Sequence, residues 1–152
     1  VNIQIANFMK KFTDLLEKDS RNRGIKIDCY TAPEVDAAQL DPRALHQVFL
    51  NIVGNAFEAL ENVEKPKITI RVSKLPNLIR FNIHDNGHGI REENLQDIFR
   101  PFFTTKTEGS GLGLNIVQKI LSRMNGSIKV ESQPGTGTKV TIDIPEERCE
   151  NG

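Results

Sequence analysis

Apolar residues in the first part of the chain recur at helical spacing. The positions fall three or four residues apart, and charged residues fill the gaps between them: Ile5, Phe8, Met9, Phe12, Leu15 and Leu16. A stripe of this kind is typical of a helix that buries one face. The pattern predicts a helix that starts with the first residue of the chain and ends before Gly24.

Two further stretches repeat with the same period. Asp41 and Pro42 form a helix start, an N-cap residue followed by proline at the first helical position, for a helix that extends to about residue 61. A third helix is predicted over residues 114–124 and closes at Asn125 and Gly126. The residues expected to face inward are Leu45, Val48, Phe49, Ile52, Val53 and Ala56 in the second helix, and Leu114, Val117, Ile120, Leu121 and Met124 in the third.

Alternating apolar and polar residues predict the strands. The clearest are residues 25–30, 67–72, 78–85, 127–131 and 138–144, and residues 35–40 form a weaker candidate. Two pairs of these strands are joined by short turns and read as hairpins. Hairpins separated by helices indicate an α/β fold, a two-layer sandwich with a mixed, mostly antiparallel sheet and helices on one face.

Composition limits the classes of function. The 152 residues carry 20 basic and 20 acidic side chains, so the chain offers no overall basic field for nucleic acid. The apolar runs are far shorter than a membrane span, and two cysteines are too few for a disulfide framework. We expect a cytoplasmic location with no membrane contact by this chain, which leaves open a membrane anchor in a longer parent protein. The expected organisation is an N-terminal helix over residues 1–24, one domain over residues 25–148 and a tail over residues 149–152.

The periodic pattern breaks over residues 86–113, a glycine-rich stretch that reads as a functional loop or lid. Just before it, the second predicted helix places Asn51, Asn55 and Glu58 on one face. That face is either an ordinary solvated surface or a metal and phosphate site. The second interpretation rests on chemistry, because a side-chain amide oxygen is a hard ligand suited to Mg²⁺.

The loop begins with a carboxylate and two glycines, Asp85, Gly87 and Gly89. This sequence is either a common turn after a strand or a site where a flat ligand approaches the backbone and donates a hydrogen bond to the carboxylate. His84 and His88 straddle the glycine turn, which disfavours a metal pair.

The loop ends with a second glycine run, residues 109–114, which opens the third helix. Free N–H groups at a helix start bind phosphate, although the spacing matches neither the P-loop nor the dinucleotide fingerprint. The aromatic run Phe99 to Phe103 and Lys106 lie upstream, and they are read as a hydrophobic latch and a cation that reaches a phosphate.

Taken together, residues 25–145 resemble the catalytic, ATP-binding domain of sensor histidine kinases, in the superfamily shared with the DNA gyrase B subunit, heat-shock protein 90 and MutL. Asn51 to Asn55 resembles the N box, Asp85 to Gly89 the first glycine box, residues 99–103 the F box and residues 109–114 the second glycine box, while residues 135–138 match the closing strand motif. The F-box run resembles the nitrogen-regulation and sporulation type of kinase. The resemblance implies the Bergerat ATP-binding fold, ATP as cofactor and Mg²⁺.

The resemblance also implies roles for single residues. Asn55 would hold Mg²⁺, Asp85 would accept from the adenine amino group, and Thr138 would support that contact through water. Gly89 and Ile90 would form the floor under the base, and Lys106 would approach the terminal phosphate. The implied nucleotide-binding residues are Asn55, Asp85, Gly87, Gly89, Ile90, Thr105, Lys106, Gly109, Ser110, Gly111, Leu112, Gly113 and Thr138, and the implied catalytic residues are Asn51, Asn55 and Lys106.

In this family the phosphate goes to a histidine on a dimerisation domain and then to a response regulator. His46, His84 and His88 lack the setting of that acceptor, so we expect it to lie outside this chain. Three other classes stay open: a conformational ATPase, an anti-sigma type serine kinase and a degenerate nucleotide-binding module. The ATPase class is disfavoured because Asn51 stands where those relatives carry a glutamate base.

Overall fold

The computed structural model describes residues 2–99 and 113–146 of the chain. Its main sheet has five strands in the order β2-β4-β5-β7-β6. The strands are β2 (Lys26–Thr31), β4 (Lys67–Leu75), β5 (Leu78–Asp85), β6 (Ser127–Gln133) and β7 (Gly137–Pro145). β2 and β4 run parallel, and each of the other neighbouring pairs is antiparallel. The prediction of a mixed, mostly antiparallel sheet is therefore confirmed.

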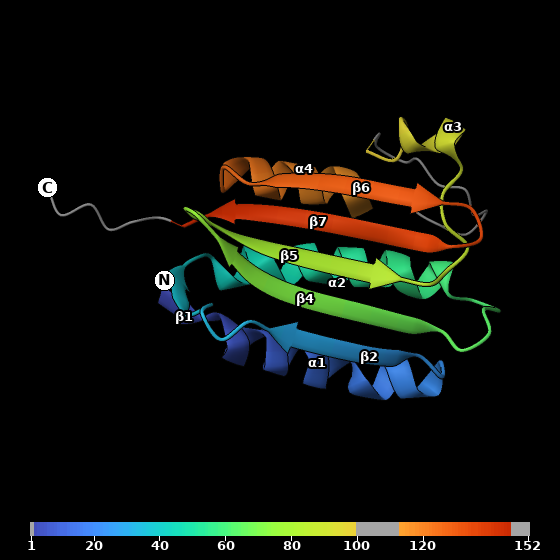
Figure 1. The fold of residues 1–152 in the computed structure, drawn as a ribbon, viewed down its shortest axis with the longest axis horizontal. Coiled ribbons are helices and arrows are strands. Elements are labelled where there is room, and N and C mark those ends of the chain that lie inside the picture. Colours follow the sequence, from blue (N-terminus) through green and yellow to red (C-terminus); the bar gives the residue numbers. More distant parts are fainter. Residues whose placement is uncertain (1, 100–112, 147–152) are drawn as a thin grey trace, which may run out of the picture.

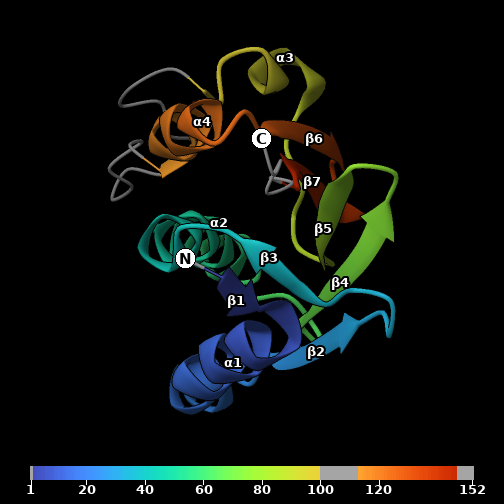
Figure 2. The same ribbon diagram turned by 90° about the vertical axis from the view of Figure 1, so that its left-hand side faces the viewer.

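Three long helices pack on one face of this sheet (Figures 1 and 2). They are α1 (Ile5–Asn22), α2 (Pro42–Ala59) and α4 (Gly113–Arg123), and the short helix α3 (Glu92–Leu95) lies near the end of β6. Figure 2 looks along the layers and shows no described helix on the other face of the sheet. The arrangement is the predicted two-layer α/β sandwich.

A column of aromatic rings connects the helices to the sheet. The ring centre of Phe12 in α1 lies 5.7 Å from that of Phe49 in α2, which lies 5.1 Å from that of Phe81 in β5. All three side chains are buried. Ring pairs at this separation add a specific attraction to the area they bury, so α1 belongs to the core of this domain.

The beginning of the chain differs from the prediction. Residues Asn2–Gln4 form a short strand, β1, which pairs antiparallel with β3 (Ala37–Gln39), and α1 begins only at Ile5. The inclusion of Leu15 in the apolar stripe was also wrong, since its side chain is 71% exposed. The later helix start follows from this pairing. The partner of β1 lies more than thirty residues away in the sequence, so the local pattern does not indicate a strand here.

The helix α2 forms as its sequence predicts. The carboxylate of Asp41 accepts hydrogen bonds from the backbone N–H groups of Arg43 at 3.0 Å and Ala44 at 3.3 Å, which caps the helix start. All six residues predicted to face inward are buried. In α4 only Val117 and Leu121 of the predicted set are fully buried.

The long irregular stretch contains one element that the sequence pattern does not show. Helix α3 occupies four residues and has no buried member, so it leaves no apolar period to detect. None of the helices among the described residues is long and apolar enough to cross a membrane.

Candidate functional site

The candidate site lies where β5 ends beside β7. Asp85 is the last residue of β5 and stands opposite Thr138 in the register of the two strands. Both residues are buried, with exposures of 6% and 8%. Directly opposed side chains in antiparallel strands lie on the same face of the sheet, so a carboxylate and a hydroxyl are held side by side.

The Asp85 carboxylate sits in a poorly solvated place. Its oxygen Oδ1 accepts a hydrogen bond of 2.9 Å from the backbone N–H of Gly87. Burial raises the pKa of Asp85 above its ordinary value, while the Gly87 N–H, the nearby His84 and the backbone of Thr138 lower this pKa in part. The result is a buried acceptor, which can bind a group that donates hydrogen bonds.

The glycines around Asp85 are required by the neighbouring backbone. A Cβ on Gly87 would lie 2.6 Å from the carbonyl oxygen of Ala59, and a Cβ on Gly137 would lie 2.0 Å from that of Asp85. Gly89 has a φ of +76°, and a Cβ there would lie 2.1 Å from the carbonyl oxygen of Gln133. The sequence suggested that Gly87 and Gly89 admit a ligand; the structure shows in addition that backbone atoms lie close to the position of a Cβ at each of them, so the turn packs tightly against its neighbours.

The connection between α2 and β4 holds one side of this turn. The backbone N–H of His88 donates to the carbonyl oxygen of Ala59 at 3.0 Å, and its ring nitrogen Nε2 lies 2.7 Å from the carbonyl oxygen of Glu61. The side chain of Asn86 accepts from the backbone N–H of Lys67 at 2.7 Å. His84, near the end of β5, is exposed, as is His88.

The turn between β6 and β7 holds the other side. The backbone N–H of Gly135 donates to the carbonyl oxygen of His88 at 2.8 Å, and that of Ile90 donates to the hydroxyl of Ser132 at 2.7 Å. The same hydroxyl lies 2.8 Å from that of Thr138. The segment from Asp85 to Ile90 is therefore fixed by two different parts of the chain.

A second part of the site forms where α2 meets the start of α4. The amide nitrogen of Asn51 donates to the carbonyl oxygen of Gly113 at 3.3 Å, and its oxygen accepts from Gln47 at 2.9 Å. The side-chain amide of Asn55 lies beside Gly113, since a Cβ there would be 3.4 Å from its nitrogen and 3.5 Å from its oxygen. Asn55 is exposed, so its amide is accessible at the first turn of α4. The structure therefore brings Asn51 and Asn55 of α2 to the start of α4 at Gly113.

Several predicted site residues lie outside the described part of the chain. These are Thr105, Lys106, Gly109, Ser110, Gly111 and Leu112, together with the aromatic run from residue 101 onward. The predicted residues that the structure describes fall into the two groups above, around Asp85 and around Gly113.

Two residues near the site have no counterpart in the predictions. Ser132 joins the two loops described above, and the alternation of β6 marks it only as one polar position among several. Asn115, in the first turn of α4, is 8% exposed, and its Oδ1 has no hydrogen-bond partner among the described residues. A polar residue early in a helix normally reads as solvated, so no sequence signal points to its burial.

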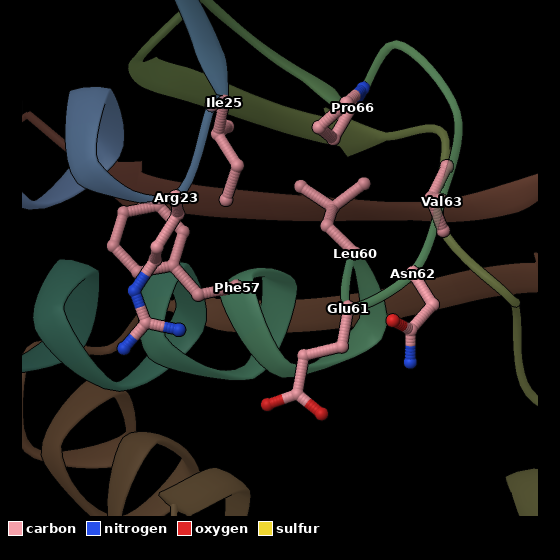
Figure 3. A pocket seen from close by; sticks show the side chains of 9 residues that line it. Arg23, Ile25, Phe57, Leu60, Glu61, Asn62, Val63 and Pro66 are labelled. Carbon is pink, nitrogen blue, oxygen red and sulfur yellow. The ribbon is translucent and has the colours of Figure 1, made fainter.

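A hollow of about 460 Å³ lies on the other side of the connection between α2 and β4 (Figure 3). Phe57 and Leu60 form apolar parts of its wall, and the guanidinium of Arg23 stacks over the Phe57 ring at 5.1 Å. Neither Asp85 nor Asn55 lines it. The hollow is therefore separate from the candidate site.

Comparison with known proteins identifies the family to which this fold and site correspond. Residues 40–148 match the family model described as histidine kinase-, DNA gyrase B-, and HSP90-like ATPase. The sensor histidine kinase ZraS of Escherichia coli K12 is 35% identical over 143 residues, which cover 94% of this chain and 30% of ZraS. Sporulation kinase C of Bacillus subtilis is 33% identical over 147 residues, covering 93% of this chain and 33% of that kinase. The chain thus spans about a third of the length of these relatives.

Solved structures agree with the sequence comparison. The nucleotide-free catalytic domain of histidine kinase ThkA superposes with a TM-score of 0.84 at 32% identity, covering 96% of this chain and 95% of that domain. ThkA in complex with the response regulator TrrA gives 0.79 at 28% identity, over 97% of this chain and 42% of ThkA. Full-length ShkA in complex with AMPPNP gives 0.87 at 25% identity, over 98% of this chain and 31% of ShkA. The chain belongs to the histidine kinase-, DNA gyrase B- and HSP90-like ATPase family, as a catalytic domain of the sensor histidine kinase type.

Proposed function

We propose that this domain binds Mg-ATP and donates the γ-phosphate to a histidine on a dimerisation domain of the same protein, within a two-component signalling kinase. The observation that carries the proposal is the pair of sites on one domain: a buried acceptor at Asp85, and an exposed amide at Asn55 beside the start of α4. ShkA, a relative with the same fold, is described in complex with the ATP analogue AMPPNP.

Asp85 accounts for the choice of base. An ionised carboxylate only accepts hydrogen bonds, so it pairs with the exocyclic amino group of adenine and repels the carbonyl oxygen of guanine. Gly89 and Ile90 lie directly after it and form the floor of the base site, held in place by Gln133 and Ser132. The chain therefore binds ATP in preference to GTP.

The phosphates lie at the start of α4 in this proposal. The first N–H groups of a helix have no partner within the helix and carry the positive end of its dipole, which attracts phosphate. Residues 109–112 extend this site, and Lys106 and Thr105 contribute contacts to the terminal phosphate; these assignments follow the family resemblance.

Asn55 fits a divalent ion. Its neutral amide oxygen is a hard ligand on an exposed side chain next to the phosphate site, and Mg²⁺ prefers such a ligand together with phosphate oxygens and water. When bound, the ion would neutralise the charge that develops on the transferred phosphoryl group. Asn51 acts by holding Gly113 through its 3.3 Å hydrogen bond, which keeps the helix start aligned with Asn55.

The phosphoacceptor is proposed to lie outside this chain. His46 packs its ring against Phe12 at 5.6 Å, and the ring of His88 contacts the carbonyl oxygen of Glu61. Neither lies on an exposed helical face suited to receive a phosphoryl group. A response regulator is the proposed recipient in the next step, as the ThkA complex with TrrA illustrates for that kinase.

A conformational ATPase is the alternative, and one observation weighs against it. Those relatives activate water with a carboxylate at the position of Asn51. Here that side chain is an amide whose two groups already contact Gly113 and Gln47. An amide cannot take a proton from water, so ATP hydrolysis by the chain alone is expected to be negligible.

Two measurements test the proposal. Calorimetric titration with ADP and Mg²⁺ is expected to show saturable binding, and titration with GDP much weaker binding. The chain is then mixed with ATP and the helical histidine domain of its parent protein, and phosphohistidine is expected to form on that domain only. Absence of ADP binding, or a domain that receives no phosphate, would overturn the corresponding half of the proposal.

A further inference from the structure

We propose that Ser132 is a positioning residue of the adenine site, which forces the hydroxyl of Thr138 to act as a hydrogen-bond acceptor toward the bound base. This inference rests on the proposed function, because it assigns a specificity role within the same nucleotide site. It concerns the juxtaposition of two hydroxyls and one backbone N–H at the junction of β6, β7 and the turn after β5.

The Ser132 hydroxyl has three polar neighbours. Its Oγ lies 2.7 Å from the backbone nitrogen of Ile90, 2.9 Å from the carbonyl oxygen of Gly137 and 2.8 Å from Oγ1 of Thr138. These distances are all in the range of good hydrogen bonds. Ser132 stands opposite Thr138 in the register of β6 and β7, so the contact between the two hydroxyls follows from the sheet itself.

Counting hydrogen atoms gives one arrangement that satisfies all three contacts. The N–H of Ile90 can only donate, and the carbonyl of Gly137 can only accept. Ser132 therefore accepts from Ile90 and donates its single hydrogen to Gly137. The remaining contact is a hydrogen bond only if Thr138 donates to Ser132. In this arrangement Ser132 uses both lone pairs and its one hydrogen, and its capacity is full.

This arrangement determines what Thr138 and the neighbouring Asp85 carboxylate together present to a ligand. Thr138 is opposite Asp85 in the register of β5 and β7, and both are buried. With its hydrogen committed to Ser132, Thr138 presents only lone pairs to the site. Asp85 and Thr138 then form an edge that only accepts, which suits an amino group, directly or through water, and rejects a ring carbonyl oxygen.

Ser132 also fixes the floor of the base site. Its hydroxyl accepts from the N–H of Ile90, the residue after Gly89, and so links this residue to β6. Gly89 itself lies against the backbone of Gln133, at the end of the same strand. The Ser132 hydroxyl thereby fixes the position of the backbone below the base and makes the edge formed by Asp85 and Thr138 an acceptor of hydrogen bonds. Neither effect requires Ser132 to touch the nucleotide, which is why it is a positioning residue.

The test compares the affinities for ADP and inosine diphosphate, whose base carries a carbonyl oxygen in place of the amino group. In Ser132→Ala, Thr138 is free to rotate and donate to that oxygen. The preference for ADP over inosine diphosphate, measured by calorimetry with Mg²⁺, is expected to fall roughly three- to tenfold, the size of one neutral hydrogen bond. Ser132→Thr, which keeps a hydroxyl, is expected to retain most of the preference.

The matched control is Thr138→Val, which keeps the shape of the side chain and removes the hydroxyl. In that background, Ser132→Ala is expected to leave the ADP preference unchanged, since no hydroxyl remains to be turned. A Ser132→Ala protein that loses affinity for both nucleotides in equal proportion has only a structural defect, and that result overturns the proposal. If the unmodified chain binds neither nucleotide, the proposed function itself fails, so the two failures are distinguishable.

Discussion

Replacing Asp85 by asparagine separates the effect of its buried carboxylate on nucleotide binding from its effect on the stability of the fold. The substitution keeps the size of the side chain and an oxygen that can accept from the N–H of Gly87 at 2.9 Å. It removes the negative charge and places an NH₂ group, a donor, at the edge that is proposed to receive the adenine amino group. Nucleotide binding is therefore expected to weaken, while the stability of the unliganded protein is expected not to fall.

The size of the binding loss follows from the kind of hydrogen bond. A hydrogen bond to a charged group contributes about 1.5–3 kcal/mol, and every 1.4 kcal/mol corresponds to about a factor of ten in Kd. The affinity for ADP is expected to fall roughly 10- to 100-fold in Asp85→Asn. A neutral acceptor at this place would give a smaller loss, so the magnitude tests whether the carboxylate is ionised when it binds.

The pH dependence has a definite sign. Burial raises the pKa of Asp85 above 3.8 in the folded state, so the folded protein holds this proton more tightly than the unfolded chain. As the pH rises from about 3.8 through the raised pKa, the contribution of Asp85 to the free energy of unfolding falls, and above that range the penalty for its buried charge is constant. Asp85→Asn lacks this penalty, so its stability gain is absent below pH 3.8 and largest near neutral pH.

Two assays on the same proteins check this reasoning. Calorimetric titration with ADP and Mg²⁺ measures affinity, and urea unfolding followed by circular dichroism measures stability between pH 4 and 7. The expected pattern is weaker binding together with equal or higher stability at neutral pH. An Asp85→Asn protein that is destabilised at neutral pH, or that binds ADP with unchanged affinity, would refute the assignment of a buried, ionised acceptor.

Three further substitutions probe other parts of the site. Gly89→Ala adds a Cβ that meets the carbonyl oxygen of Gln133 at 2.1 Å in a left-handed conformation, so urea unfolding should show a loss of at least about 2 kcal/mol, and a near-neutral effect would contradict the locked turn. Asn51→Ala removes the hydrogen bond to Gly113 and should cost about 1 kcal/mol of stability but weaken Mg-ADP binding only a few-fold in calorimetry; complete loss of binding would make Asn51 a direct ligand. Asn115→Leu replaces a buried amide oxygen without a described partner, so the urea midpoint of the unliganded protein should rise by the equivalent of about 1 kcal/mol or more, and an unchanged or lower midpoint would show that this oxygen is satisfied.

Elements whose signal is local could be predicted from the sequence. The N-cap at Asp41, the apolar face of α2 and the alternation of β4 and β5 depend on neighbours within a few residues, and each is found as predicted. The Asp85 turn fits two readings by its own sequence, a common turn after a strand or a ligand site, and only the resemblance across several separate motifs favours the second. The helix cap and the periodic patterns, in contrast, need no information from distant parts of the chain.

The rest depends on contacts between distant segments. Residues 2–4 form a strand only because Ala37–Gln39 lies beside them, and their own sequence runs into the helix without a break. Leu15 belongs to the apolar stripe by spacing, yet it lies outside the surface that α1 buries. The role of Ser132 depends on three residues from two other segments, so no motif within β6 could indicate it.

The glycines show how the two kinds of information differ. Their positions are visible in the sequence, which suggests a ligand as the reason for Gly87 and Gly89, and the structure adds a second reason, since backbone of Ala59 and Gln133 lies where their side chains would be. A turn that is packed against two other loops has few alternative conformations to lose when a nucleotide binds. If a nucleotide binds as proposed, the fold already holds the base half of the site in place, and a single buried carboxylate can then discriminate between purines.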